Sequence, residues 1–238
     1  FVFINQLMVL VVATPVQQRQ EQLWWAGQQR GFMLTRYGKG PKCGLDQKGI
    51  EMNKNLHVVL PLGLQELILQ KASSFPEETG GALVGYRLER IDDGCKVWLL
   101  RTFLPPGPGA IHGSCSFAQG GLYQAALLSL LRRLEKWPKS KLWRGQGPFF
   151  LGDWHSHPSL SNLPSTGDKE TVQKLLAEEA KLPGLVVMIA ANGNGRKWTL
   201  GTHLALRQED EVKWQEAKVC TPKELGLHEE LARIAPWP

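Results

Sequence analysis

The stretch Gly152 to Asp168 constrains this chain more than any other. It contains His-Ser-His-Pro and, after a short polar loop, the sequence Ser-Thr-Gly-Asp. The apolar residues 149–151 precede it, behind a Gly-Pro pair that is typical of a turn, so we expect a buried strand that runs into His155. Side chains two residues apart in a strand share a face, which turns His155 and His157 the same way. Two imidazoles arranged in this way can bind one metal ion.

The residues after the histidines predict a loop and then a helix. Pro158 cannot continue a central strand, so the strand should end there. Ser165-x-x-Asp168 precedes a helical pattern over residues 169–177 and is typical of a capping box. A carboxylate in the first turn of a helix beside the strand end can provide a third metal ligand. Each motif also has an ordinary interpretation, because isolated histidine pairs and capping boxes usually bind no metal.

An upstream stretch, Phe75 to Gly85, adds Glu78 before Thr-Gly-Gly. A glutamate, a long gap, His-Ser-His-Pro, a serine and an aspartate at this spacing resemble the motif of the JAB/MPN (JAMM) zinc metalloproteases. The likeness covers about residues 56 to 206. It implies a mixed α/β fold of the JAB/MPN type, with a central sheet flanked by helices and with N- and C-terminal extensions.

The resemblance also assigns roles to five residues. It implies that His155, His157 and Asp168 bind Zn²⁺, that Glu78 is the catalytic glutamate and that Ser165 is the active-site serine. Two neutral imidazoles and one carboxylate leave one position of a tetrahedral zinc open, as in catalytic sites. Water in that position has a pKa of about 7 and can attack an amide without a covalent acyl-enzyme.

The proton transfers require a base near this water. Glu78 suits the role because a desolvated carboxyl group has a raised pKa, and it can return the proton to the leaving amine. Glu77 is the alternative base, but it is further from the glycines that let a strand approach the site. The Ser165 hydroxyl can donate to the developing oxyanion, an interaction typically worth about 2 to 4 kcal/mol. We assign Asp153 to the opposite strand face and to a structural role.

The Gly-Asp-Trp before His155 is most similar to bacterial members of the family found beside ubiquitin-like conjugation genes in anti-phage operons. This resemblance implies a peptidase or isopeptidase that cuts after the C-terminal tail of a ubiquitin-like protein, either to process a precursor or to remove a conjugate. Activating or conjugating enzymes of the same operon would be partners. A non-catalytic MPN scaffold and a metallopeptidase acting on small peptides are the alternatives.

Composition divides the chain into three regions: a basic extension at 1–55, the JAB/MPN domain at 56–206, and a tail at 207–238 with a short helix near 224–234. The extension holds seven Lys/Arg and three Asp/Glu and so contributes +4 of the net charge of +6. A basic arm with aromatic residues can touch nucleic acid, but a solvated extension is commoner, and we expect no nucleic-acid partner. The apolar residues 1–13 are too short to span a membrane.

The remaining features predict the other elements and the compartment. We expect strands at 81–88, 95–103, 185–190 and 197–206, helices through 67–72, 122–134 and 171–181, and a turn at Asp92-Asp93-Gly94. The basic run from Arg132 to Arg144 is interpreted as a solvated surface, or else as a docking patch. His112 is interpreted as a surface residue that can border the cleft, and His203 as structural. Four scattered cysteines and no secretion signal indicate reduced thiols and a cytoplasmic protein.

Overall fold

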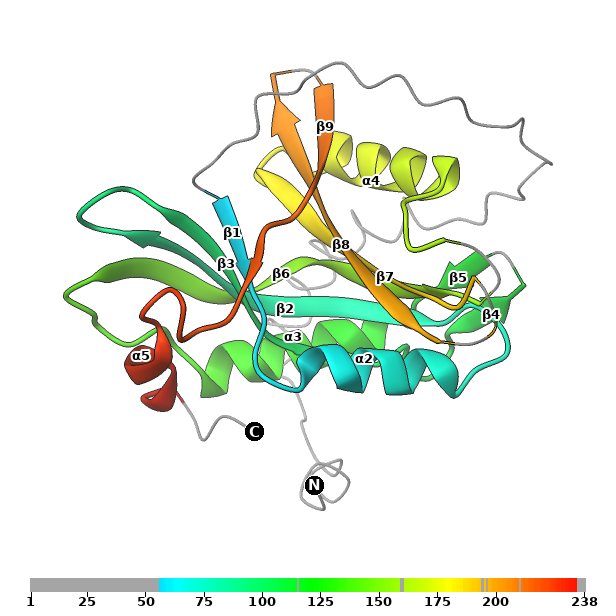
Figure 1. Cartoon of the computed structure of the whole chain (residues 1–238), viewed down its shortest axis with the longest axis horizontal. Coiled ribbons are helices and arrows are strands. Elements are labelled where there is room, and N and C mark those ends of the chain that lie inside the picture. The colour runs from blue at the N-terminus through cyan, green and yellow to red at the C-terminus, as the bar shows by residue number, and fades with distance from the viewer. Residues whose placement is uncertain are drawn as a thin grey trace, which may run out of the picture.

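The fold was analysed in a computed structural model that describes residues 56–234 apart from 115, 159, 160, 194, 196 and 210. The predicted basic extension at 1–55 lies outside the described residues. A mixed eight-stranded sheet forms the centre of the domain, in the order β10-β1-β3-β2-β6-β7-β8-β9 (Figure 1). Its strands are β1 (Leu56–Val59), β2 (Gly80–Arg90), β3 (Lys96–Phe103), β6 (Trp143–His157), β7 (Gly184–Ala191), β8 (Thr199–Gln208), β9 (Glu211–Glu216) and β10 (Val219–Cys220).

Helices cover both faces of this sheet, as the sequence predicts. The helices are α2 (Leu64–Ser73), α3 (Gly121–Leu134), α4 (Thr166–Glu178) and α5 (His228–Ala232). The buried side chains of α2 pack into one apolar cluster, and those of α3 and α4 pack into another on the other face. Figure 1 shows α4 and α2 on opposite sides of β7. Every residue of β7 is buried, because a strand covered on both faces has no solvent side. None of the helices among the described residues is long and apolar enough to span a bilayer.

Strand β6 differs from its prediction in one respect. Gly147 and Pro148 do not form a turn before it but lie inside it, joined by a cis peptide bond. The register with β2 shifts at this point, where Gly85 pairs with Phe149 but Arg87 pairs with Gln146. A bulge of this kind accommodates a proline that cannot donate to the ladder. The strand therefore begins earlier than predicted, at Trp143, and still ends at His157.

The ends of two other predicted segments also differ. Helix α4 ends at Glu178, before the predicted end at 181. Residues 207–238, expected to form a tail, include β9 and β10, which pair with β8 and β1 and complete the two edges of the sheet. Val212 and Trp214 of β9 pack against the apolar cluster of the α4 face. The short helix expected near 224–234 is α5, which packs through Leu231.

Candidate metal centre

The pairing of β2 with β6 brings the two distant parts of the motif together. Gly80 lies opposite His155 in this antiparallel pair. Next to it, the Ser156 N–H donates to the Thr79 carbonyl at 2.7 Å, and the Thr79 N–H donates to the Ser156 hydroxyl at 3.0 Å. A side chain on Gly81 would place its Cβ 1.9 Å from the Leu104 carbonyl oxygen, so this strand requires glycine there. Glu78 is therefore held at the end of β6 that carries the histidines.

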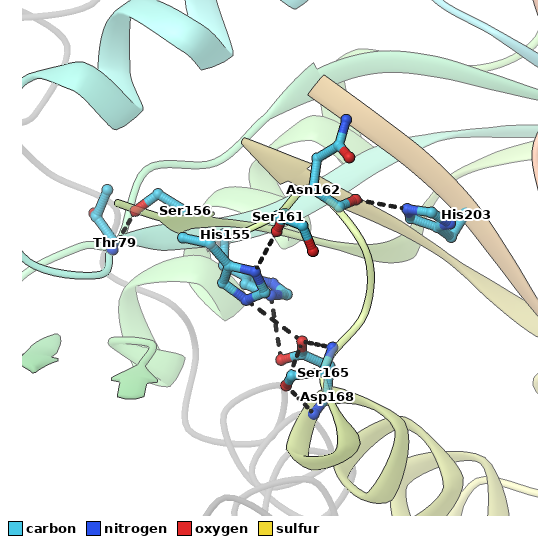
Figure 2. A network of polar contacts seen from close by, with 9 residues as sticks. Thr79, His155, Ser156, Ser161, Asn162, Ser165, Asp168 and His203 are labelled. Atoms are coloured by element: carbon cyan, nitrogen blue, oxygen red, sulfur yellow. Dashed lines mark hydrogen bonds and ion pairs between the residues drawn. The ribbon is translucent and has the colours of Figure 1, made fainter. Parts of the chain in front are cut away.

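The two histidines converge on one carboxylate, that of Asp168; Figure 2 shows His155 and Asp168 at this contact. His155 Nε2 lies 3.2 Å from one oxygen of Asp168, and His157 Nε2 lies 3.5 Å from the other. The two rings have their centroids 4.9 Å apart. Nδ1 of His157 donates to the Ser161 carbonyl at 3.0 Å. This bond places the proton on Nδ1 and leaves Nε2 free as a ligand, which is the usual arrangement for a metal-binding histidine.

Helix α4 presents Asp168 through the predicted capping box. Ser165 is the N-cap, and its hydroxyl accepts from the Asp168 N–H at 3.2 Å. The same hydroxyl donates to the Asp168 carboxylate at 2.7 Å, and the Ser165 N–H donates to it at 2.7 Å. Burial opposes ionisation of Asp168, but the His155 charge and these hydrogen bonds outweigh it and hold the pKa of Asp168 well below its usual range. Asp168, the candidate third ligand, is thus kept ionised.

The geometry of these three residues fits a zinc ion. Their ligand atoms all lie within 4.8 Å of one another. Ligands at about 2.1 Å in a tetrahedral site lie about 3.4 Å apart, close to the two distances from Asp168. His155 Nε2 is buried and lies 3.2 Å from an Asp168 oxygen, so a metal ion at this point would be bound by the imidazole nitrogen and the carboxylate together. Two imidazoles and one carboxylate are also the donor types that zinc prefers.

Glu78 is buried beside this centre, whereas Glu77 is exposed. The Glu78 side chain is only 7% accessible. Burial raises the pKa of Glu78 to about 7, against the opposing charges of His157 and His155. A carboxyl group that takes up and releases a proton near neutral pH is well suited to general acid and base catalysis. Of the two glutamates, Glu78, which the sequence analysis prefers, is therefore the one that is buried at the site.

A short hairpin, β4 (Ile111–Gly113) with β5 (Ser116–Ala118), fixes the backbone of Glu78. The Glu78 N–H donates to the Gly113 carbonyl at 2.9 Å. His112 donates from Nδ1 to the Glu78 carbonyl at 2.9 Å, and its ring stacks on Phe75 at 5.0 Å. His112 thus borders the site, as one of its two interpretations allowed. Three-residue strands have too little periodicity to be found from the sequence.

The strand face predicted for Asp153 is wrong, whereas its predicted structural role is not contradicted. The register of β6 with β7 is regular from Gly152 to His157, so Asp153 shares a face with His155, two residues later. Burial raises the pKa of Asp153 to about 6; the His155 charge opposes the rise and the Asp168 charge adds to it. One Asp153 oxygen is buried without a hydrogen-bond partner in the described part of the chain. Asp153 therefore lies within electrostatic reach of the metal centre.

His203 holds the loop between the two halves of the centre. Its Nε2 donates to the Asn162 carbonyl at 2.9 Å across from β8 (Figure 2). Asn162 follows Ser161, whose carbonyl orients His157. His203 is buried and structural, as expected. Its acceptor, Asn162, is next in sequence to Ser161, the acceptor of the candidate ligand His157. No sequence signal marks a backbone carbonyl as an acceptor, so this connection could not be predicted.

The fold and the centre together define a mixed α/β domain with a His-x-His and aspartate site beside a buried glutamate. The family model of prokaryotic homologs of the JAB domain matches residues 63–201, which include all five candidate site residues. The chain belongs to this family. JAB domains include JAMM peptidases and also inactive members, so family membership alone does not establish the reaction.

Other comparisons add little. The solution structure of protein DSY2949 from Desulfitobacterium hafniense is 20% identical and covers 70% of this chain and 92% of its own, with a TM-score of 0.45. No curated protein sequence matches the chain significantly.

Proposed function

We propose that this protein is a zinc-dependent isopeptidase or peptidase that hydrolyses the amide bond after the C-terminal tail of a ubiquitin-like protein. The observation that carries the proposal is the convergence of His155, His157 and Asp168 next to the buried carboxyl group of Glu78. Burial also raises the pKa of Glu78 to about 7, which suits a group that exchanges protons near neutral pH. Perturbed groups of this kind cluster at functional sites.

The site residues have different roles in the proposed hydrolysis. Zinc at the three ligands would supply a Lewis acid that polarises the scissile carbonyl and lowers the pKa of a water molecule. Glu78 accepts the proton of the attacking water and delivers it to the leaving amine. Ser165 holds the Asp168 carboxylate in this geometry, because its single hydroxyl proton points to that carboxylate. Donation from Ser165 to an oxyanion requires the hydroxyl to turn away from Asp168.

The surroundings of the centre favour a protein substrate over a small one. Two large apolar side chains are exposed beside it: Ile111 precedes His112 in the hairpin, and Leu163 lies in the loop before Ser165, with accessibilities of 55% and 56%. Exposed apolar side chains around a site are typical of protein contacts. The choice of a ubiquitin-like tail comes from the family resemblance, as do the proposed partners, the activating or conjugating enzymes of an anti-phage operon. The proposed cytoplasmic location comes from the cysteine pattern of the sequence.

The test combines metal content with cleavage. Purified wild type and Glu78→Gln are assayed for zinc by elemental analysis and for hydrolysis of a ubiquitin-like fusion, with the exposed Glu77→Gln as the matched control. We expect one zinc per chain in all three proteins, and cleavage by wild type and Glu77→Gln only. Zinc binding with equal cleavage by Glu78→Gln would refute the assignment of the base.

A second comparison separates the alternatives. The same three proteins are given a short peptide that ends in the tail of the fusion. Preference for the full fusion supports a deconjugating enzyme, and equal rates favour a peptidase of small substrates. A folded protein that neither binds zinc nor cleaves either substrate would favour the non-catalytic scaffold.

A further inference from the structure

A groove with no role in the proposed reaction lies on the sheet face opposite the metal centre. It has a volume of about 770 Å³ and is lined in part by Leu56, Trp98, Phe149 and Leu206. These four residues belong to, or pack against, the apolar cluster of the α2 face. The metal centre adjoins α4, which packs on the other face. The groove and the centre are therefore separate sites.

Arg87 occupies the floor of this groove in an unusual environment. Its neighbours across the sheet are Trp98 on β3 and Gln146 on β6. The guanidinium carbon lies 5.6 Å from the Trp98 ring centroid and 5.8 Å from that of Phe149. One nitrogen, Nη2, donates to the Phe150 carbonyl at 3.4 Å, while Nε is buried with no hydrogen-bond partner in the described residues.

The charge of Arg87 lacks a counterion among the described residues. Other arginines of the sheet have one: Arg101 lies 3.1 Å from Glu135, and Arg144 lies 2.9 Å from Glu89. Burial lowers the pKa of Arg87, which means that desolvation disfavours its charge. Arg87 is half-buried, and a guanidinium that is partly withdrawn from water is more stable when a negative charge pairs with it. An anion in the groove would supply that partner.

The other residues that line the groove favour an anionic ligand that also carries a planar ring. Lys96, Arg144 and Arg207 also line the groove, against one acidic side chain, Glu89. The aromatic ring of Phe149 and the side chain of Leu206 offer an apolar shelf, and Gln146 and Gln208 offer amide groups that can pair with the edge of a base. A guanidinium matches the oxygens of a phosphate in a forked geometry. Pockets of about 300 to 1,000 Å³ accommodate small organic ligands.

We propose that this groove binds a nucleoside phosphate, with the phosphate on Arg87 and the base on the apolar shelf between Gln146 and Gln208. An extended peptide is the weaker alternative, because the strands that form the floor already pair on both sides. β1 lies between β10 and β3, β3 between β1 and β2, and β2 between β3 and β6. A peptide cannot add a strand there and would lose the main-chain pairing that such recognition uses.

The test measures binding of the four ribonucleoside monophosphates to the full chain by calorimetry, with inorganic phosphate and free adenosine as partial ligands. EDTA is present throughout, and His155→Ala is included, so that phosphate on a metal cannot account for the signal. We expect at least one mononucleotide to bind at least tenfold more tightly than either partial ligand, in wild type and in His155→Ala alike.

Arg87→Met is the decisive variant, because methionine keeps an apolar chain over the two rings and removes the charge. We expect it to weaken mononucleotide binding at least tenfold while its Tm stays equal to or above that of wild type, since it removes a half-buried charge that has no counterion among the described residues. Arg90→Gln, on the same strand but ion-paired with Asp92 outside the groove, should bind as wild type does.

Three results would overturn the proposal. The first is no mononucleotide binding at millimolar concentration. The second is binding that Arg87→Met leaves unchanged, or that Arg90→Gln reduces equally. The third is a large fall in the Tm of Arg87→Met, which would show that Arg87 stabilises the fold and is not held ready for a ligand.

Discussion

The burial of Glu78 should make the metal-free protein less stable as the pH rises. The folded protein holds this carboxyl group with a pKa of about 7, raised from the ordinary value of 4.5 by burial. Between these values the folded state binds more protons than the unfolded state, so the free energy of unfolding falls with increasing pH. The stabilising effect of protonation is complete below pH 4.5 and is lost as the pH passes 7.

The size of the effect follows from the two pKa values. One pH unit of difference corresponds to about 1.4 kcal/mol. Ionisation of Glu78 therefore costs the fold about 1 kcal/mol at pH 5 and about 3 kcal/mol at pH 8. The Glu78→Gln variant cannot ionise at this position and keeps nearly the same shape. Metal-free Glu78→Gln should thus gain about 2 kcal/mol of stability relative to metal-free wild type between pH 5 and pH 8.

Urea unfolding in EDTA at several pH values measures this difference. Titrating groups far from Glu78 are common to both proteins and cancel in the comparison, whereas the charges of His155 and Asp168 interact with Glu78 and contribute to the measured difference. Glu77→Gln, exposed and one residue away, should show no such trend. Adding Zn²⁺ should shrink the trend, because a nearby positive charge lowers the pKa of Glu78. A difference between wild type and Glu78→Gln that stays constant from pH 5 to 8 would refute the argument from burial.

Three further predictions concern the metal ligands and their supports. Asp168→Ala should abolish stoichiometric zinc binding, measured by elemental analysis of the folded protein, because it removes the ligand on which both histidines converge. Ser165→Ala should lower the free energy of unfolding by about 1 kcal/mol, because the helix loses its cap. It should also lower zinc affinity by about 10-fold or more, because Asp168 loses the hydrogen bond from Ser165. Ser165→Thr should restore most of the stability and most of the zinc affinity. His203→Ala should weaken zinc binding about 10-fold in a chelator competition, because the loop loses its bond at Asn162, and an unchanged zinc affinity would show that the loop needs no such support.

The candidate centre was predictable because its signals are local. The apolar run, Pro158 and the Ser165-x-x-Asp168 box each determine the conformation of a few consecutive residues, and together they place three candidate ligands at one strand end. The position of Glu78 does not follow from a local signal, because only the pairing of β2 with β6 brings Glu78 to the end of β6 that carries the histidines. The family resemblance supplied that long-range step; spacing alone could not have done so.

What the sequence did not predict depends on contacts between distant segments. The hairpin that carries His112 and the loop bond of His203 consist of short pieces whose partners are backbone carbonyls. Strand β9 is a partial exception, since Val212 and Trp214 alternate with charged or polar residues in the period of a half-buried strand. This alternation is visible in the sequence, but the mixed charge of residues 207–238 led to the prediction of a tail in place of a strand.

Arg87 illustrates why burial is harder to predict than secondary structure. In the sequence it stands between Tyr86 and Leu88, so strand alternation assigns it to the face opposite these two apolar residues. An arginine at such a position ordinarily reaches water. Here that face also carries Trp98 and Phe149, and the guanidinium lies over their rings in the groove. The charge is partly withdrawn from water only because residues far apart in the chain meet on this face. It has no counterion among the described residues, and an anionic ligand in the groove would provide one.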